Sequence, residues 1–549
     1  MHENVFKFTF HSLQFIYLLM QQILNKYHHW SVIFLFLVNL INGIVYIPQQ
    51  SITSDEGDHF NYAVRFVKGH PEKIKPFDDA SAMPVSILNT IPRVVEQLLH
   101  PTLKKINWGY DDIMHGRYIT FIISLLIGLY VYLWSKDLFG KTASFFSLLL
   151  FVFCPNISAH AGLVTTDIYS ALFTIVPLYH FWKYSKQNSL RQFILFSSTL
   201  ALAQLCKQSL TFLYPLFLLL FLLQALYKKN LKSLYSKLTL GNVLVFILIQ
   251  LFILNAGFQF KGTGKPLAHY SFRSHFFQNV QQNFHFIVNF PLPVPSPYLE
   301  GLDCTKTIDE IGPGHPESSP RVYLLGKVKE GKGFRSYYFV VLFFKTPIPL
   351  LLAFFTSLFL FIKKKEKETA WNATVLLLPI IFFLVYFNFF YNSQVGIRHI
   401  LMILPLMQVF SGLFFKKLLD KNRMIVIAAI VFYSITTFYH YFPYLIPYTN
   451  EFIIEKKMAY KKIADSNLDY HQSSGLLKKY IEDGKAVYAP DHPAAGIFII
   501  DVDDLIGVKE EKDYNWLRKN YKPSGHLAFT YLIFEVSKES LSEKNLLQR

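Results

Sequence analysis

Residues 31–59 read SVIFLFLVNLINGIVYIPQQSITSDEGDH, an apolar run followed within a few residues by an acidic run. The apolar part, 31–47, carries no charged side chain and approaches the ~20 residues with which a helix crosses the hydrocarbon core of a membrane. The acidic part contains Asp55, Glu56 and Asp58 within four positions. A carboxylate pair is therefore expected directly beside the bilayer, where ionisable groups usually serve a site.

Similar apolar runs recur along all 549 residues and predict an α-helical polytopic membrane protein with about 11 transmembrane helices. Hydrophobic residues make up 52% of the chain and aromatic residues 17%, and Phe alone occurs 55 times. A chain of this composition is expected to face lipid over much of its surface. The predicted spans are 31–47, 117–134, 142–155, 167–182, 192–206, 210–227, 238–257, 337–362, 370–391, 398–415 and 424–441.

The formal charge of +17 comes largely from basic clusters in the short connections between spans, which argues against nucleic acid as a partner. All the clusters fall on one side, which the positive-inside rule assigns to the cytoplasm. Lys7 and Lys26 precede the first run, which is expected to stay as a signal anchor. The clusters are Lys136 and Lys141; Lys183, Lys186 and Arg191; Lys228, Lys229, Lys232 and Lys237; Lys363, Lys364, Lys365 and Lys367; and Lys416, Lys417, Lys421 and Arg423.

The same alternation divides the chain into two expected domains. Residues 1–441 form the membrane domain, with two long outer loops at 48–116 and 258–335. Residues 442–549 form a small extracytoplasmic α/β domain. Its pattern predicts a helix at 473–481 and strands at 486–488, 496–501 and 527–535. Cys154, Cys206 and Cys304 do not make a disulfide framework.

Two acidic positions are candidates for chemistry. Asp55 with Glu56, and Asp167 after Thr165-Thr166, each stand where a helix could begin, and capping of that helix is one reading of them. The other reading is catalytic, because a transfer to a hydroxyl acceptor needs a carboxylate to take its proton. Asp167 falls on the same outer side as Asp55, so the two could meet at one membrane edge. His160 could line the same cavity, although a lone His is more often structural.

Two cationic positions stand out on the same side. Lys207 interrupts the apolar sequence between the fifth and sixth spans, and snorkelling to the interface would also explain it. Arg398-His399 begins the tenth span, where the helix dipole disfavours a cation. A cation kept at that position suggests a nearby anion such as a phosphate.

These residues, in this order and on one side, resemble the GT-C membrane glycosyltransferases. The nearest group is the family 39-like one of protein O-mannosyltransferases and aminoarabinose transferases, and the resemblance covers most of the chain. Asp55-Glu56 with His59 and Tyr62 is similar to the first-loop acidic motif, and Gly396–Leu401 resembles the GxRH motif. The resemblance is also carried by Pro155-Asn156, His160-Ala161, Thr165–Asp167, Cys206–Ser209, Tyr323–Gly326, Phe344–Pro347, Tyr448–Glu451 and Asp465–Tyr470.

The chain departs from the family pattern at two places. Ser81–Ser86 stands where many relatives carry a His-Pro-Pro run, and Tyr470-His471 stands where a Trp-Gly pair is common. Both places lie in outer segments that would contact the acceptor. The acceptor, whether lipid, glycan or protein, is therefore left open.

The resemblance implies transfer of a sugar, of hexosyl or mannosyl type, from a polyprenyl phosphate to an acceptor on the outer face, with inversion. Asp55 would be the general base, supported by Glu56, and Asp167 would orient the acceptor or a metal. No cofactor is required, although Asp55 and Asp167 could hold a divalent metal. Arg398, Lys207 and Lys345 would bind the donor phosphate, while His59, His160 and His399 would contact substrate.

Two other functions fit part of the pattern. A lipid-linked sugar flippase or other transporter would need ionisable residues near the bilayer midplane, where only polar groups such as Gln204, Gln250 and Asn255 are found. A non-catalytic membrane subunit would bind a partner through its polar tail, and the acidic pair together with Arg398 argues against it. The expected location is a bacterial inner membrane, with the active site on its extracytoplasmic side.

Overall fold

The computed structural model describes most of the chain. Some of the basic positions named above, which fall in 1–25, 229–238, 364–366 and 421–422, lie outside the described residues. The described ranges are 26–73, 79–100, 109–228, 239–284, 288–316, 318–363, 367–420, 423–508 and 513–546.

The fold is mostly helical, and within the described residues every predicted span is helical, which confirms a multi-pass membrane protein. Six segments are long and apolar enough to cross a membrane unbroken, and two more are bent pairs. The six contain α2 (His28–Tyr46), α5 (Tyr110–Phe139), α10 (Leu213–Lys228), α12 (Leu240–Gly257), α17 (Lys367–Phe389) and α19 (Met424–Tyr441). The other predicted spans form α8 (Asp167–Gln187), α9 (Leu190–Ala203) and α18 (Ile403–Asp420), which are shorter or less apolar.

Two predicted spans are broken rather than straight, and proline is the cause in both. The span expected at 142–155 divides into α6 (Lys141–Val152) and α7 (Pro155–Ala161), with a bend of 60°. The span expected at 337–362 divides into α15 (Tyr337–Lys345) and α16 (Ile348–Lys363), with a bend of 115°. Proline disfavours helical geometry in the residue before it, and both Cys154 and Thr346 are extended.

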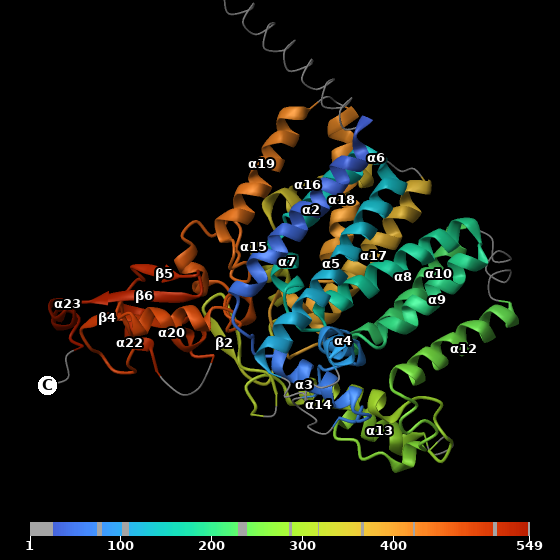
Figure 1. The fold of residues 1–549 in the computed structure, drawn as a ribbon, viewed down its shortest axis with the longest axis horizontal. Helices are drawn as coiled ribbons and strands as arrows, with labels where there is room; N and C mark the ends of the chain where they lie inside the picture. The colour runs from blue at the N-terminus through green and yellow to red at the C-terminus, as the bar shows by residue number, and fades with distance from the viewer. Residues whose placement is uncertain are drawn as a thin grey trace, which may run out of the picture.

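The two long loops expected on the outer side, 48–116 and 258–335, carry short elements of their own, which gather at one end of the helical bundle (Figure 1). The first loop contains η1 (Ile47–Gln49), α3 (Glu56–Val67), η2 (Pro84–Thr90) and α4 (Ile91–Leu99). The second contains η4 (Leu267–His269), α13 (His275–Asn283), α14 (Ser296–Ile311) and the hairpin of β1 (Val322–Leu324) and β2 (Lys327–Lys329). Two 3-10 turns, η3 (Gln208–Phe212) and η5 (Ile397–Ile400), start or interrupt spans near this end.

The C-terminal part forms a four-stranded sheet of order β3-β4-β6-β5 with helices beside it (Figure 1). β3 runs parallel to β4 and the other pairs are antiparallel. The strand expected at 527–535 is instead two strands, because Ala528 and Phe529 take positive φ and turn the chain. The elements are η6 (Lys456–Lys461), η7 (Asp465–Asn467), α20 (Ser474–Glu482), β3 (Val487–Tyr488), β4 (Gly496–Asp501), α21 (Val502–Ile506), α22 (Asn515–Asn520), β5 (Gly525–Leu527), β6 (Tyr531–Val536) and α23 (Lys538–Glu543).

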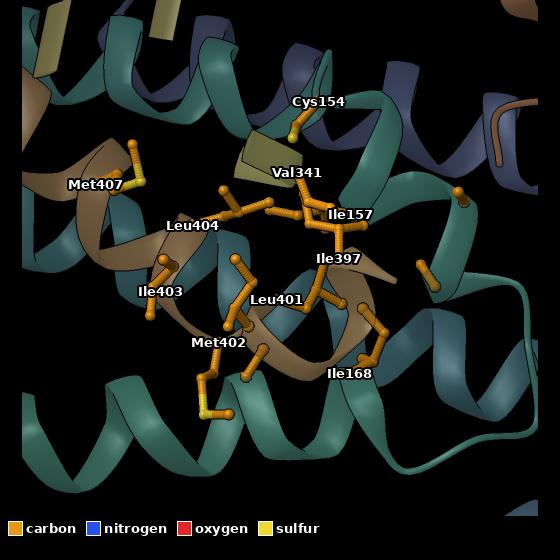
Figure 2. Packing of buried hydrophobic residues seen from close by; sticks show 14 of the residues in the cluster. Cys154, Ile157, Ile168, Val341, Ile397, Leu401, Met402, Ile403, Leu404 and Met407 are labelled. Atoms are coloured by element: carbon orange, nitrogen blue, oxygen red, sulfur yellow. The ribbon is translucent and has the colours of Figure 1, made fainter. Parts of the chain in front are cut away.

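One continuous apolar core holds the helices that carry the candidate site. Ile157 of α7, Ile168 of α8, Val341 of α15 and Ile397 of η5 gather in it together with Leu401 (Figure 2). Each is buried, with at most 3% of its surface exposed. Because Ile157, Ile168 and Ile397 lie within three residues of His160, Asp167 and Arg398 in the chain, this packing fixes the backbone from which those polar side chains project.

Candidate active site

Two ion pairs lie together beside the outer-loop elements. Nη1 of Arg398 donates to Oδ2 of Asp55, and Nζ of Lys207 lies 2.6 Å from Oδ1 of Asp167. His59 lies close to both pairs, since the charges of Asp55, Asp167 and Arg398 all act on the pKa of its side chain. Four charged side chains from distant parts of the chain, two of each sign, therefore share one site.

Capping does not account for either aspartate. Asp55 stands at the N-cap position of α3, but its side chain makes no capping hydrogen bond and instead accepts from Arg398. Asp167 opens α8, where its Oδ2 accepts from Thr165 Oγ1 at 3.2 Å and its other oxygen contacts Lys207. The helix dipoles favour both acids at these positions, while their side-chain oxygens serve the two cations.

The two carboxylates differ in accessibility. The side chain of Asp55 is 30% exposed, against 3% for Asp167. Burial raises the pKa of Asp55, but the charge and hydrogen bond of Arg398, with a further hydrogen bond from Tyr470, outweigh it and hold the pKa below its ordinary value. Asp55 is thus ionised at neutral pH and is the more exposed of the two carboxylates.

Arg398 is held in place by the segment Asp465–Tyr470, to which the sequence assigned no role in binding. Tyr470 accepts a hydrogen bond from Nη1 of Arg398, and its ring lies 4.7 Å from the guanidinium carbon. Asn467 accepts from the backbone N–H of Ile397 at 3.0 Å, and Tyr337 Oη accepts from that of Gly396 at 3.0 Å. The positive φ of Gly396 permits this close approach.

Glu56 has a different environment from Asp55. It is fully buried and accepts five hydrogen bonds: two from Arg117, two from Thr53 and one from the backbone of Val164. Arg117 is equally buried and also donates to the carbonyls of Gln50 and Ser51. Glu56 therefore ties the first outer loop to α5 and to the segment before α8.

Lys345 does not pair with a carboxylate of the site. Its ammonium donates to the backbone carbonyls of Ile446 and Asn467 at 2.6 and 2.7 Å, and the residue is 1% exposed. Those carbonyls belong to the chain that follows α19. Lys345 consequently fastens this chain to the break between α15 and α16. Its connection to the site is indirect, through Asn467, which bonds to the backbone of Ile397 beside Arg398.

The three histidines proposed from the sequence lie near the two ion pairs, since the charges of Asp167 and Arg398 act on each of them. Tyr338 Oη lies 3.1 Å from Nδ1 of His399. Nδ1 of His59, Nδ1 of His160 and Nε of Arg398 are buried and have no hydrogen-bond partner among the described residues. Burial lowers the pKa of His59 to about 4, although Asp55 and Asp167 oppose the shift. Neutral His59 can therefore exchange hydrogen bonds with hydroxyl groups.

The described residues contain no group of three or more His, Cys, Asp or Glu side chains placed to hold a metal ion. The two aspartates expected as metal ligands each accept from a cationic side chain instead. A divalent cation at either one would compete with Arg398 or Lys207 for the same oxygen. As arranged, these carboxylates fit protein cations rather than a metal.

The chain was compared with known proteins. Residues 110–253, about a quarter of the chain, match the family model described as dolichyl-phosphate-mannose-protein mannosyltransferase. Over this segment the chain is similar to the mannosyltransferases that the family model describes. The matched segment runs from α5 through most of α12 and contains His160, Asp167 and Lys207. No curated protein matches the chain by sequence.

Among solved structures, the fold is similar to ArnT from Cupriavidus metallidurans in the apo state, with 12% identity, a TM-score of 0.48 and coverage of 93% of this chain and 98% of that one. For ArnT from the same organism bound to undecaprenyl phosphate, the identity is 11% and the TM-score is 0.45, with coverage of 93% of this chain and 99% of that one. A third similar structure is the oligosaccharyltransferase AglB from Archaeoglobus fulgidus in complex with an inhibitory peptide and a dolichol-phosphate. Its identity is 14% and its TM-score is 0.42, with coverage of 85% of this chain and 60% of that one. Likenesses at this level carry no inference about the site.

Proposed function

We propose that this protein is a glycosyltransferase that moves a sugar from a polyprenyl-phosphate-linked donor to a hydroxyl acceptor on the outer side of the membrane. The observation that carries the proposal is the pairing of an accessible, ionised Asp55 with Arg398, close to Lys207, since both cations act on Asp167. A base and two cations are the groups that such a transfer needs. The base takes the acceptor's proton, and the cations neutralise the phosphate that leaves.

In the proposed reaction the acceptor oxygen attacks the anomeric carbon of the donor. Its proton passes to Asp55 as the new glycosidic bond forms. The bond between the anomeric carbon and the phosphate oxygen breaks, and polyprenyl phosphate leaves with both electrons of that bond. Attack opposite the leaving group inverts the anomeric configuration. The planar fork of Arg398 suits two phosphate oxygens, and Lys207 supplies a second positive charge.

Donor binding would then rearrange the ion pairs. Arg398 is bonded to Asp55 without substrate, and a phosphate offers it more charge and more acceptor oxygens. Moving the guanidinium toward the phosphate would weaken its hold on Asp55 and raise the proton affinity of that carboxylate. The base would therefore be strongest when donor is present, which suppresses proton uptake in the empty site.

The other named residues receive supporting roles. Asp167 would orient Lys207, with which it pairs at 2.6 Å. The unpartnered nitrogens of His59 and His160 are suited to sugar hydroxyls, and His399 would assist from its bond with Tyr338. In this proposal Glu56 and Lys345 position the first outer loop and the C-terminal chain, in place of the roles in chemistry and phosphate binding that the resemblance implied.

The proposal also includes location and domain limits. The basic clusters favour an inner bacterial membrane with the site on its extracytoplasmic side. Residues 470–472 lie along 51–54, with Ser51 N donating to the carbonyl of Gln472 at 2.8 Å and Ser54 Oγ 2.8 Å from Nδ1 of His471. We therefore propose that the segment up to about residue 473 works with the membrane domain. The separate α/β unit would begin with α20.

A direct assay tests the function. Purified protein is mixed with a radiolabelled polyprenyl-phosphate mannose and extracts of outer-membrane glycolipid or peptide acceptors, and release of free polyprenyl phosphate is followed. Acceptor-dependent release by the wild-type protein, lost in Arg398→Ala, supports the proposal. Movement of intact donor across a vesicle membrane without release would support a flippase and contradict it.

A further inference from the structure

Helix α14 of the second outer loop contacts the segments that carry both cations of the site. Near its start, Tyr298 Oη donates to Oε1 of Gln204 at 3.0 Å and lies 2.9 Å from Oγ1 of Thr211. One turn further, Gly301 leaves room for Gln208, whose Nε2 lies 2.1 Å from where a Cβ would be. Gln204, Gln208 and Thr211 flank Lys207 in sequence, so this end of α14 packs on the Lys207 turn.

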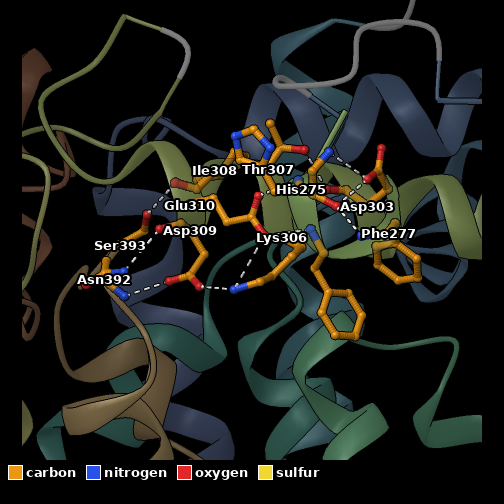
Figure 3. Close-up of polar contacts among 12 residues, drawn as sticks. His275, Phe277, Asp303, Lys306, Thr307, Ile308, Asp309, Glu310, Asn392 and Ser393 are labelled. Atoms are coloured by element: carbon orange, nitrogen blue, oxygen red, sulfur yellow. Dashed lines mark hydrogen bonds and ion pairs between the residues drawn. The ribbon is translucent and has the colours of Figure 1, made fainter. Parts of the chain in front are cut away.

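The other end of α14 holds the chain that leads to Arg398 (Figure 3). Oδ1 of Asp309 accepts from the backbone N–H of Asn392 at 2.7 Å, and the Asp309 carbonyl accepts from Asn392 Nδ2 at 3.2 Å. Ser393 Oγ donates to the carbonyl of Ile308 at 3.2 Å. Asp309 is 4% exposed. The loop of residues 391–396 runs from Asn392 directly into η5 and Arg398.

The carboxylates next to Asp309 on the same helix serve other partners. Glu310 accepts from the backbone N–H groups of His275 and Phe276 at 2.7 and 3.1 Å. Asp303 accepts from Arg273 and Ser274. Both therefore secure α13 and the turn before it. Asp309 alone among these three contacts the 391–396 loop.

We propose that α14 sets the separation between Lys207 and Arg398, and that Asp309 is a positioning residue for Arg398. The inference rests on the proposed function, in which both cations bind one donor phosphate. A phosphate held by two cations is sensitive to their spacing, since small displacements of a binding group cost much of its interaction. Asp309 acts through the 391–396 loop and does not touch the donor.

The test compares three variants of the full-length protein. Binding of undecaprenyl phosphate in detergent micelles and the kinetics of transfer are measured for Asp309→Ala, Asp309→Asn and Glu310→Ala, with Arg398→Ala as reference. Asp309→Ala leaves the Asn392 N–H without its acceptor and should weaken lipid-phosphate binding about tenfold, equivalent to about 1.4 kcal/mol. The KM for donor should rise by a similar factor while kcat changes less than about twofold.

The controls separate positioning from folding. Asp309→Asn keeps an acceptor oxygen and should recover most of the affinity, and Glu310→Ala should bind like the wild type. A variant that merely folds less well would lower kcat per mole of protein and leave KM unchanged. Unchanged affinity and KM in Asp309→Ala, with Arg398→Ala impaired, would overturn the role of α14. Unchanged binding in Arg398→Ala would instead overturn the phosphate assignment of the proposed function.

Discussion

At the scale of single residues, the site is organised by competition for two cations. Arg398 and Lys207 each satisfy a carboxylate, and the Arg398 pair is partly accessible, with 13% and 30% of its side chains exposed. Partly exposed pairs of this kind are weak enough to be exchanged. The arrangement keeps Asp55 ionised and leaves Arg398 available for a better anion.

A pH profile tests the coupling of Asp55 to Arg398. Because Arg398 lowers the pKa of Asp55 against the effect of burial, the base form persists in the wild type as pH falls below the ordinary aspartate range. Replacing Arg398 with Gln removes the opposing charge and should raise that pKa. We expect the acid limb of kcat/KM to lie at higher pH in this variant than in the wild type.

The lowered pKa of Asp55 also determines how the stability of the folded protein depends on pH. A carboxylate whose pKa is lowered by folding stabilises the protein above its unfolded pKa, and this stabilisation is lost as pH falls through the folded value. An acid limb at the same pH in Arg398→Gln and the wild type, with both proteins folded, would show that Arg398 does not control the base.

Glu56 and its neighbour Asp55 should behave differently when changed. Glu56 and Arg117 form a fully buried ion pair, and removing one partner of such a pair costs about 3–5 kcal/mol. Glu56→Ala should therefore lower the thermal unfolding temperature in detergent markedly, whereas Asp55→Asn should leave it near the wild-type value. If the Glu56→Ala protein had normal stability but no activity, Glu56 would have a catalytic role instead of a structural one.

At the scale of elements, the sequence predicts which segments are helical and where the site residues stand, but not how the segments bend. Pro155 and Pro347 are visible in the sequence, yet the angles at the two breaks depend on what α7 and α15 pack against. The turn between β5 and β6 lacks Gly and Asn, the residues that usually signal a positive φ. No local pattern therefore divides that predicted strand.

Partners that are distant in sequence were also beyond prediction. Arg117 is 61 residues from Glu56, and Tyr470 is 72 residues from Arg398. Arg117 was expected only as the start of a span. Tyr470 was named as the end of a motif and as a departure from the family pattern, without a role beside Arg398. The ordered motifs, in contrast, named Asp55, Asp167, Lys207 and Arg398, which form the two ion pairs of the candidate site.

Gly396 tests the element that carries Arg398. Its φ is +56°, and a Cβ would lie 2.3 Å from Oγ of Ser466, so Gly396→Ala must distort η5 or the chain beside it. We expect a cost of about 1–2 kcal/mol from the backbone alone and weaker donor binding. The control is Gly57→Ala in α3, where nothing lies within 4 Å of the added atom. Equal behaviour of the two variants in thermal unfolding and binding would contradict this account.

At the scale of the whole molecule, the site is assembled from three regions. They are the first long loop, the starts of the helical segments that carry Asp167, Lys207 and Arg398, and the chain after α19. Lys345, Asn467 and Tyr470 fasten that last chain to the membrane helices. Its sheet lies to one side of the bundle (Figure 1). The chain after α19 is thus needed to position Arg398, whatever the sheet itself contributes.

Thiol labelling tests the orientation in the membrane. The three native cysteines are buried, so an impermeant maleimide should read only introduced ones. Glu482→Cys in the C-terminal part and Gln187→Cys beside the basic connection are both at exposed positions. In spheroplasts we expect Glu482→Cys to be labelled and Gln187→Cys to be protected until the membrane is permeabilised. The opposite pattern would put the site on the cytoplasmic side.

The central claim is that Asp55 takes the acceptor's proton while Arg398 holds the donor phosphate. Single-turnover transfer from a labelled polyprenyl-phosphate sugar, with donor binding measured on the same Asp55→Asn sample, tests it most directly. We expect a rate lower by about 10²–10⁴-fold, with donor bound at least as tightly as by the wild type because Arg398 has lost its carboxylate. Near-normal turnover, or loss of donor binding in a folded protein, would contradict it.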